Sequence, residues 1–290
     1  MPTSNSSQRA RLRSIEGRHN LLLKELRKAF AGAELTADNC CAIEGLRVVE
    51  EAIRTGLRFR AVFFSTSATG KAEKLLPQIG AHVETVVVPD KLFENTVPSE
   101  SPQGVAALAF CKSFSLEDVL ARIEFGPVLA IVSLQDPGNL GTILRSAEAF
   151  GAAGVLLGEG TVSAYNSKVV RASAGSIFRL AAVKVRIKDA LAQLRAAGLR
   201  LLATSSHKGL SLPQAELGKP AAIFIGGEGA GLGRHLIAEM DEVVAIPHSP
   251  KVESLNAGVA ASIVLYEAAR QKMSLTTEAQ RHGEREALDQ

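Results

Sequence analysis

The sequence contains few aromatic residues and few cysteines, and it has no tryptophan. Aromatic residues make up 4% of the 290 positions, so rows of aromatic side chains for stacking bases are not expected. The three cysteines, Cys40, Cys41 and Cys111, are an odd number without a C-x-x-C spacing, which excludes a disulfide framework. The six histidines show no metal-ligand spacing. We therefore expect a reduced protein that holds no metal.

Long apolar runs are also missing. No stretch reaches the length of a membrane span, and the first residues are polar rather than signal-like. With 46% hydrophobic and 22% charged residues, the chain has an ordinary globular composition. These features predict a cytoplasmic protein with a buried core.

Positive charge is concentrated near the N-terminus, although the net charge is only +3. Seven Arg and Lys residues lie between Arg9 and Lys28, against two glutamates. Such a basic segment suits a polyanionic partner such as nucleic acid. A solvated helix face is the alternative interpretation.

Hydrophobic periodicity predicts an α/β fold in two domains. We expect a flexible basic tail over 1–14, a small α/β domain over 15–110, a linker over 111–126, a second α/β domain over 127–273 and a flexible tail over 274–290. In the second domain, strands are expected at Val128–Leu134, Gly154–Leu157, Leu199–Ala203, Ala221–Ile225 and Val243–Ile246. Helices are expected between them at 140–150, 166–178 and 189–197, and a last helix at 255–271. Strands that alternate with helices indicate a parallel sheet.

Three polar junctions in the second domain each follow a predicted strand and lead into a helix. The first spans residues 135–142, with Arg145 further along its helix. The second is the loop from Gly226 to Leu232, which has four glycines and one charged residue, Glu228. The third runs from Ile246 to Asn256. Because parallel strands bind ligands beyond their carboxyl ends, we expect the three junctions to converge on one pocket.

A dinucleotide fingerprint is the first alternative for the glycine-rich loop. Gly227 and Gly229 match the start of G-x-G-x-x-G, but Leu232 stands where the third glycine belongs. The loop also follows the fourth strand of its domain rather than the first, and no acidic partner follows about 20 residues later. The pattern therefore argues against a nicotinamide- or flavin-dependent enzyme.

Taken together, the three junctions resemble the SpoU/TrmH branch of the SPOUT RNA methyltransferases. The family pattern Asn-x-Gly-x-x-x-Arg is met by Asn139, Gly141 and Arg145, and Gly-x-Glu-x-x-Gly by Gly226, Glu228 and Gly231. The third pattern is met by Ile246, Pro247, Ser254, Leu255 and Asn256. The resemblance spans residues 127–273, and residues 15–110 resemble the ribosomal-protein-like domain that binds the RNA substrate in such proteins.

This resemblance implies a fold, a cofactor and a reaction. The fold is a C-terminal α/β knot, with a deep trefoil knot and a parallel sheet, in a homodimer whose active site lies at the subunit interface. The cofactor is S-adenosyl-L-methionine, and the acceptor is a ribose 2′-hydroxyl in structured RNA. The basic front domain favours ribosomal RNA; transfer RNA, or a catalytically silent RNA-binding protein of the same fold, is the alternative.

Residue roles follow from the same resemblance. The catalytic residues would be Arg145, Asn139, Glu228, Ser254 and Asn256. The donor would be held by Gly226, Gly227, Ile246, Pro247, Leu255 and Asn256, where the glycines leave room for the adenosine. RNA phosphates would be bound by Lys24, Arg27, Lys168 and Arg171, for which a plain surface position is the alternative.

Overall fold

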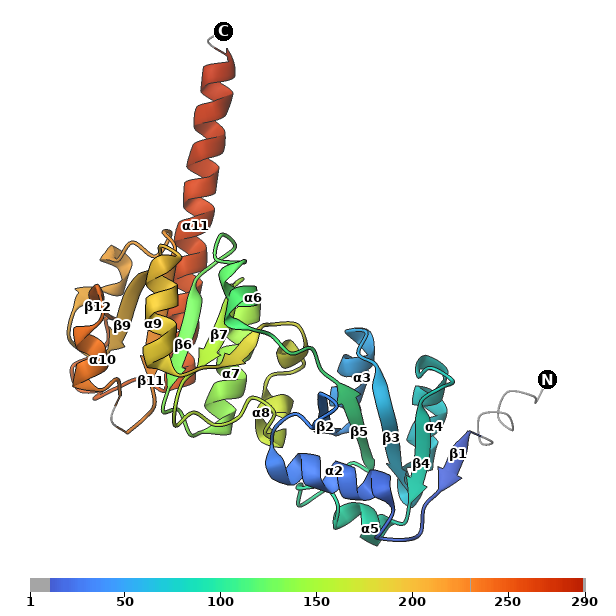
Figure 1. Cartoon of the computed structure of the whole chain (residues 1–290). Helices are drawn as coiled ribbons and strands as arrows, with labels where there is room; N and C mark the ends of the chain where they lie inside the picture. The colour runs from blue at the N-terminus through green and yellow to red at the C-terminus, as the bar shows by residue number, and fades with distance from the viewer. Residues whose placement is uncertain (1–10, 230, 289–290) are drawn as a thin grey trace. The chain divides into compact units, whose positions relative to one another are not determined.

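The computed structural model describes residues 11–229 and 231–288, with side chains as far as Ser274. The chain forms two compact units, each built around its own sheet (Figure 1). Unit 1 contains the described residues up to Ser113 together with Ser163–Arg179. Unit 2 contains Phe114–Val162 and the described chain from Leu180 onward.

Unit 1 is a mixed five-stranded sheet with helices on its faces. The strand order is β1-β4-β3-β5-β2; β1, β4 and β3 are parallel, and β5 is antiparallel to both β3 and β2. The strands are β1 (Leu12–Ser14), β2 (Cys40–Glu44), β3 (Phe59–Ser65), β4 (Glu84–Val88) and β5 (Val105–Phe110). The helices are α2 (Leu21–Gly32), α3 (Leu46–Arg54), α4 (Thr69–Leu75) and α5 (Asp90–Glu94), and α8 (Ser167–Ala172) also packs on β2.

Helix α2 shows how the sequence builds this unit. Asn20 caps the helix, because its side-chain oxygen accepts a hydrogen bond from the Leu22 backbone at 2.9 Å. Leu22 and Leu26 are buried on the inner face of the helix and belong to the same core cluster as Phe63 of β3. The outer face keeps Lys24 and Lys28 exposed. The amphipathic pattern therefore places the basic residues on the surface.

Unit 2 is a seven-stranded sheet in which all strand pairs are parallel, in the order β10-β12-β9-β11-β6-β7-β8. The strands are β6 (Val128–Val132), β7 (Gly154–Leu157), β8 (Ala182–Lys184), β9 (Arg200–Ser205), β10 (Leu210–Ser211), β11 (Ala221–Gly226) and β12 (Glu242–Ala245). The helices are α6 (Leu116–Leu120), α7 (Pro137–Ala149), α9 (Ile187–Ala196), α10 (Arg234–Ala238) and α11 (Ala257–Leu288).

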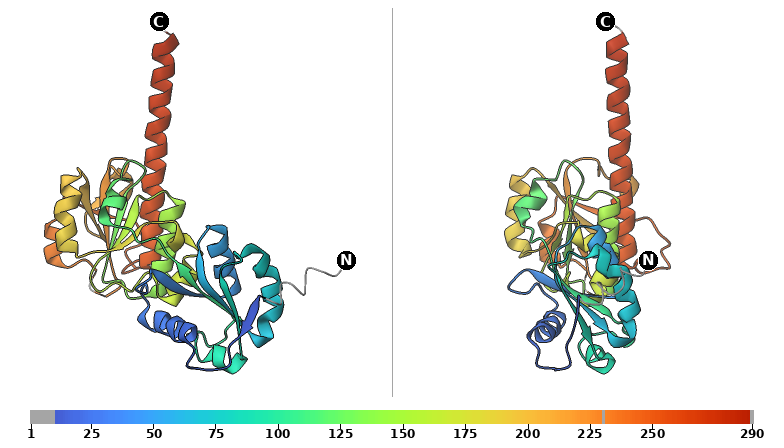
Figure 2. Two further views of the ribbon diagram at one scale, coloured as in Figure 1. Left: turned by 45° about the vertical axis from the view of Figure 1, so that its right-hand side comes forward. Right: turned by 90° about the vertical axis from the view of Figure 1, so that its right-hand side faces the viewer.

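Both faces of this sheet are covered by helices, as a parallel sheet requires. Val128 and Phe224 point to the face covered by α6, α9 and α10, where they join one hydrophobic cluster. Their neighbours Leu129 and Ile223 are buried on the opposite face. There α7 and α11 pack against each other (Figures 1 and 2). The α/β fold and the parallel sheet predicted from the sequence are confirmed.

The structure also differs from the expected organisation at several places. The strands β2, β8 and β10 were not predicted; the sequence of β2, Cys-Cys-Ala-Ile-Glu, has one β-branched residue and ends in a glutamate, so it lacks the apolar run of the predicted strands. Residues 12–14, expected in a flexible tail, form β1, and Arg11 beside it donates to backbone oxygens including that of Leu76. The first ten residues of that predicted tail lie outside the described residues. The tail expected from Ser274 is helical as far as Leu288.

Segment Ser163–Arg179 was expected within the second domain, and it packs instead with unit 1. The guanidinium of Arg171 hydrogen-bonds the Ser99 hydroxyl and lies 3.5 Å from a carboxylate oxygen of Glu44. Arg179 pairs with Glu51 at 2.6 Å. These long-range contacts leave no pattern in the sequence.

None of the helices in the described part of the chain is long and apolar enough to cross a lipid bilayer.

Candidate active site

Three loops of unit 2 meet beyond the carboxyl ends of its strands. One leads from β6 into α7, the second is the glycine-rich loop after β11, and the third leads from β12 into α11. Strands β6 and β11 are direct neighbours, which brings the first two loops together. The Gly227 N–H donates to the Val132 carbonyl at 2.9 Å and extends this pairing past the end of β11.

A chain of side-chain hydrogen bonds joins the three loops. The Asn256 amide donates to the Asn139 carbonyl oxygen at 2.9 Å, and the Asn139 amide donates to a carboxylate oxygen of Glu228. One residue comes from each junction. The predicted convergence of the three junctions is therefore confirmed.

The helix caps hold these side chains in place. Asp136 caps α7, because its carboxylate accepts from the Asn139 backbone at 2.6 Å. Asn256 precedes α11, and its side-chain oxygen accepts from the Val259 backbone at 3.1 Å. Since its oxygen is used in this way, the Asn256 amide nitrogen is oriented toward Asn139. The asparagine links therefore rest on the starts of two helices that pack against each other.

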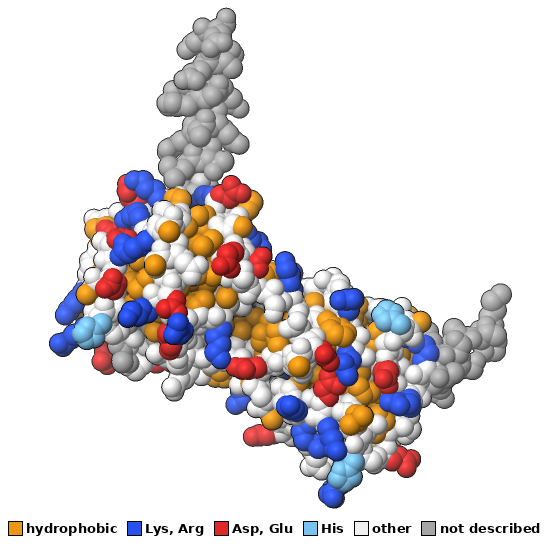
Figure 3. Space-filling model, viewed as in Figure 1, with side chains coloured by type: hydrophobic (Ala, Val, Ile, Leu, Met, Phe, Trp, Pro, Cys, Tyr) orange, Lys and Arg blue, Asp and Glu red, His pale blue; other side chains and the backbone are white. Residues whose placement is uncertain are grey.

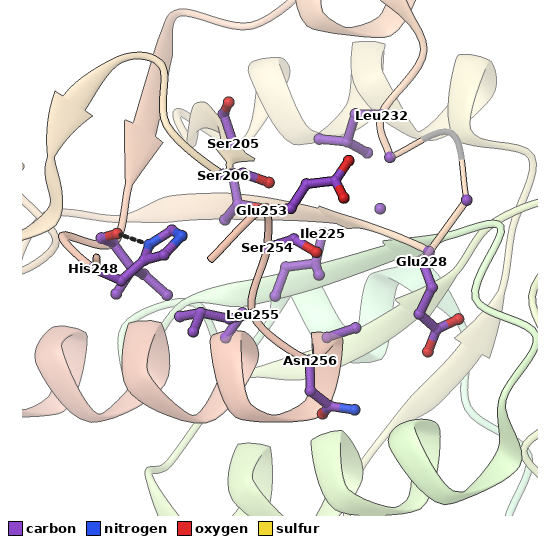
Figure 4. A pocket seen from close by; sticks show the side chains of 18 of the residues that line it. Ser205, Ser206, Ile225, Glu228, Leu232, His248, Glu253, Ser254, Leu255 and Asn256 are labelled. Atoms are coloured by element: carbon purple, nitrogen blue, oxygen red, sulfur yellow. Dashed lines mark hydrogen bonds between the residues drawn. The ribbon is translucent and has the colours of Figure 1, made fainter. Parts of the chain in front are cut away.

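A cavity of about 460 Å³ lies between the glycine-rich loop and the loop before α11 (Figure 4). Of the residues predicted to form the site, seven line it: Gly226, Gly227, Glu228, Ile246, Ser254, Leu255 and Asn256. Pro247, Asn139 and Arg145 are not among the lining residues. Its volume falls within the range of about 300–1,000 Å³ that is typical of small-molecule sites.

Sequence reasoning missed part of the lining. Thr204 and Ser205 end β9 and Ser206 follows it, and β9 lies between β11 and β12 in the sheet. Ligands bind beyond the carboxyl ends of parallel strands, and this rule also applies to the end of β9. The same rule could therefore have identified these three residues. His248 and Glu253 also line the cavity. The imidazole Nδ1 of His248 lies 2.7 Å from the Ile246 carbonyl oxygen.

The glycines Gly226 and Gly227 of the second junction have a structural role that the sequence did not predict. A Cβ at Gly226 would overlap the backbone of Gly231, and a Cβ at Gly227 would overlap the Ser133 carbonyl. A Cβ at Gly229, in contrast, would meet nothing within 4 Å. Gly226 and Gly227 therefore allow backbone segments to approach closely, and both line the cavity.

Arg145 lies on α7, six residues beyond Asn139, and its side chain is exposed. It makes no hydrogen bond or ion pair with any residue that the structure describes, so its guanidinium is free to meet a ligand. The next residue, Ser146, lies 2.7 Å from Ser262 of α11, hydroxyl to hydroxyl. This contact helps to fix the helix that carries Arg145.

The four residues predicted to bind RNA lie in unit 1, in two settings. Lys24 and Lys168 are exposed, and Arg27 is half-buried, 3.4 Å from the Thr96 hydroxyl. Figure 3 shows Lys and Arg side chains gathered at the edge of unit 1 where Figure 1 places α2. Arg171 differs from the others, because it is bound to Ser99 and Glu44.

The contact between Arg171 and Glu44 bears on the stability of unit 1. Burial raises the pKa of the Glu44 carboxyl, while the hydrogen bond from Ser99 and the positive charge of Arg171 lower it. Because burial is the largest effect, Glu44 needs these partners when it is ionised. This setting favours a tethering role for Arg171 over the predicted role in RNA binding.

The chain is also similar to known proteins in sequence and in structure. The chain matches the SpoU rRNA Methylase family over residues 126–266 and the MRM3-like substrate binding domain over residues 23–107. It is 30% identical over 256 residues to the 23S rRNA (guanosine(2553)-2′-O)-methyltransferase RlmP of Bacillus subtilis (strain 168), covering 88% of this chain and 98% of that protein.

Two further similarities concern Streptomyces viridochromogenes. The chain is 32% identical over 240 residues to its 23S rRNA (uridine(2479)-2′-O)-methyltransferase, covering 80% of this chain and 83% of that one. The crystal structure of its SpoU methyltransferase AviRb in complex with AdoMet matches with a TM-score of 0.75 and 28% identity, over 88% of this chain and 99% of that chain.

Proposed function

We propose that this chain, which belongs to the SpoU rRNA methylase family, methylates a ribose 2′-hydroxyl in ribosomal RNA with S-adenosyl-L-methionine as donor. The observation that carries the proposal is the Asn256–Asn139–Glu228 chain beside the cavity, with Arg145 on the adjoining helix unpaired among the described residues. As a family member the protein is an RNA methyltransferase, which excludes the nicotinamide or flavin alternative. The relatives named for 23S rRNA support ribosomal over transfer RNA.

The cavity suits the donor. Ile246 and Leu255 offer apolar surface for the adenine, and Ser205 and Ser254 offer hydroxyls to polar groups of the donor. The glycine-rich loop exposes backbone groups along the same wall. The sulfonium of the bound donor supplies an activated methyl group, so the protein must chiefly position the acceptor and ease the loss of its proton.

Arg145 is the group proposed to act on the acceptor. A guanidinium stays protonated, so it is a poor base. It can instead bind a phosphate next to the target ribose and stabilise the negative charge that develops on the 2′-oxygen. Asn139, Ser254 and Asn256 would orient the ribose by hydrogen bonds, and Glu228 is the candidate to accept the proton.

Methyl transfer to purified RNA tests the proposal. With tritiated donor, we expect incorporation into ribosomal RNA and little into transfer RNA, and the product should be resistant to alkali at the methylated ribose. Incorporation into transfer RNA alone would contradict the proposed substrate. Absence of transfer to every RNA would favour a silent RNA-binding protein.

Lys24, Arg27 and Lys168 are proposed to bind RNA phosphates. The Lys24→Ala variant of the full chain should bind ribosomal RNA fragments more weakly and with a shallower salt dependence, by roughly one unit of slope per phosphate contact. Filter binding at several salt concentrations measures both quantities. Arg13→Ala is the matched control, since Arg13 is already paired with Glu84 at 2.7 Å. An unchanged slope for Lys24→Ala would remove this residue from the interface.

We further propose a homodimer formed through α11. Val259, Tyr266 and Met273 lie seven residues apart on that helix, and 47%, 53% and 63% of their surfaces are exposed. Tyr266 also packs edge-on against Phe150 at 5.8 Å between ring centroids. Such an apolar stripe gains free energy when a second copy covers it. Sedimentation equilibrium should therefore give twice the chain mass.

We also propose that unit 2 contains the trefoil knot and that the protein is cytoplasmic. The knot is inferred from the family to which the chain belongs. An experimental chain trace through unit 2 tests it. Fractionation of cells that express the protein tests the location.

A further inference from the structure

The ionisable residues that line the cavity are mainly acidic. Among its described lining residues, the ionisable ones are Glu228, His248 and Glu253, and none is Lys or Arg. Lys208 and Lys251 belong to the flanking loops but do not line it. The described lining therefore carries negative charge whenever both glutamates are ionised.

Glu253 is the carboxylate free to act on a ligand. Glu228 is already hydrogen-bonded by Asn139. Glu253 is exposed and makes no hydrogen bond or ion pair with the rest of the described chain. Figure 4 shows its carboxylate turned into the cavity, between Ser206 and Leu232. Its position in the loop before α11 places it next to Ser254, which faces the same space.

We propose that Glu253 makes the cavity prefer the positively charged sulfonium donor over the neutral thioether product. The inference rests on the proposed function, in which this cavity holds the donor. On transfer, the carbon–sulfur bond breaks and its electron pair stays on sulfur, while the methyl carbon bonds the ribose oxygen and the hydroxyl proton is released. Donor and product therefore differ by one methyl group and one positive charge.

A carboxylate near the sulfur attracts the charged donor but not the neutral product. Two opposite unit charges about 4 Å apart attract each other enough to raise a binding constant roughly fivefold, even at the dielectric constant of water. The attraction grows in a partly enclosed site. It disappears when the sulfur becomes neutral, whereas the contacts to the adenine and ribose stay the same. Glu253 would thus favour donor binding and product release together.

Calorimetric titration of the full chain with three ligands tests this role. The ligands are S-adenosylmethionine, S-adenosylhomocysteine, and sinefungin, which carries an amine in place of the sulfonium. For Glu253→Gln we expect affinity for the two cations to fall about fivefold or more, with S-adenosylhomocysteine changed less than twofold. Glu124→Gln is the matched control, because Glu124 is an exposed residue that precedes β6, at the other end of that strand from the cavity.

The outcomes separate this role from the proposed function. If Glu253→Gln weakens all three ligands equally, or none, the charge selection is overturned and the donor site stands. A wild-type chain that binds no ligand, or unchanged binding in Ser206→Trp, which should fill the cavity, overturns both proposals. Glu253→Asp, which keeps the charge, should retain most of the preference; a preference lost as fully as in Glu253→Gln would also overturn the selection.

Discussion

Arg145→Ala is expected to lower the rate of methyl transfer by at least about a hundredfold while leaving donor affinity nearly unchanged. The side chain is exposed, is not part of the cavity lining and has no partner within the described chain. Its removal should therefore cost little stability and leave the donor contacts intact. What is lost is the positive charge proposed to bind a phosphate and stabilise the oxygen anion. Single-turnover transfer and calorimetric donor titration measure the two quantities.

Arg122→Ala is the control for this experiment. Arg122 is an exposed arginine of the same unit, and it precedes β6, at the other end of that strand from the site. It should keep full activity, and Arg145→Lys should recover only part of it, because a single ammonium cannot form the paired hydrogen bonds of a guanidinium. Undiminished transfer by Arg145→Ala would refute the role assigned to Arg145.

Gly227→Ala should damage both stability and donor binding. Its Cβ would overlap the carbonyl of Ser133, and backbone cannot move aside as a flexible side chain can. We expect a loss of about 1–3 kcal/mol in the free energy of unfolding, which is typical of overpacking. Donor affinity should fall as well, since Gly227 lines the cavity and its N–H is bonded to Val132. Urea denaturation and donor titration provide the measurements.

Gly229→Ala is the matched control in the same loop. Nothing lies within 4 Å of the position its Cβ would take. Its unfolding free energy should stay within about 0.5 kcal/mol of wild type. Equal effects of the two substitutions would mean that the loop requires glycine for its own flexibility, and not for the approach to Ser133.

The sequence patterns predicted the fold wherever the signal was local. Buried strands such as Val128–Val132 and Gly154–Leu157 stand out as apolar runs, and the polar junctions after them mark where helices begin. Strand β2 escaped detection because its sequence, Cys-Cys-Ala-Ile-Glu, has one β-branched residue and ends in a glutamate, so it does not stand out as an apolar run. The apolar residues of α11 recur at helical spacing in the sequence. The sequence does not show, however, that some of them stay exposed.

The candidate site was predictable for a related reason. Asn139, Glu228 and Asn256 each sit at a strand-to-helix junction, and parallel strands bring such junctions to one edge. The contribution of Ser206 depended on strand order, since β9 had to lie between β11 and β12. His248 and Glu253 lie within the third junction, but at positions outside its motif. Strand order results from long-range pairing, which no short stretch of sequence encodes.

By itself, the sequence determined the α/β class, the parallel sheet, the reaction family and the three junctions, because these depend on periodicity and on residues close together along the chain. Only the tertiary structure decided that Arg171 is tied to Glu44, while Arg145 has no partner in the part of the chain that the structure describes. It also decided that Gly226 and Gly227 make room for backbone, and that the cavity is lined by acidic residues without a described Lys or Arg. Each of these depends on which distant segments come into contact, and that is decided by the packing of the whole core.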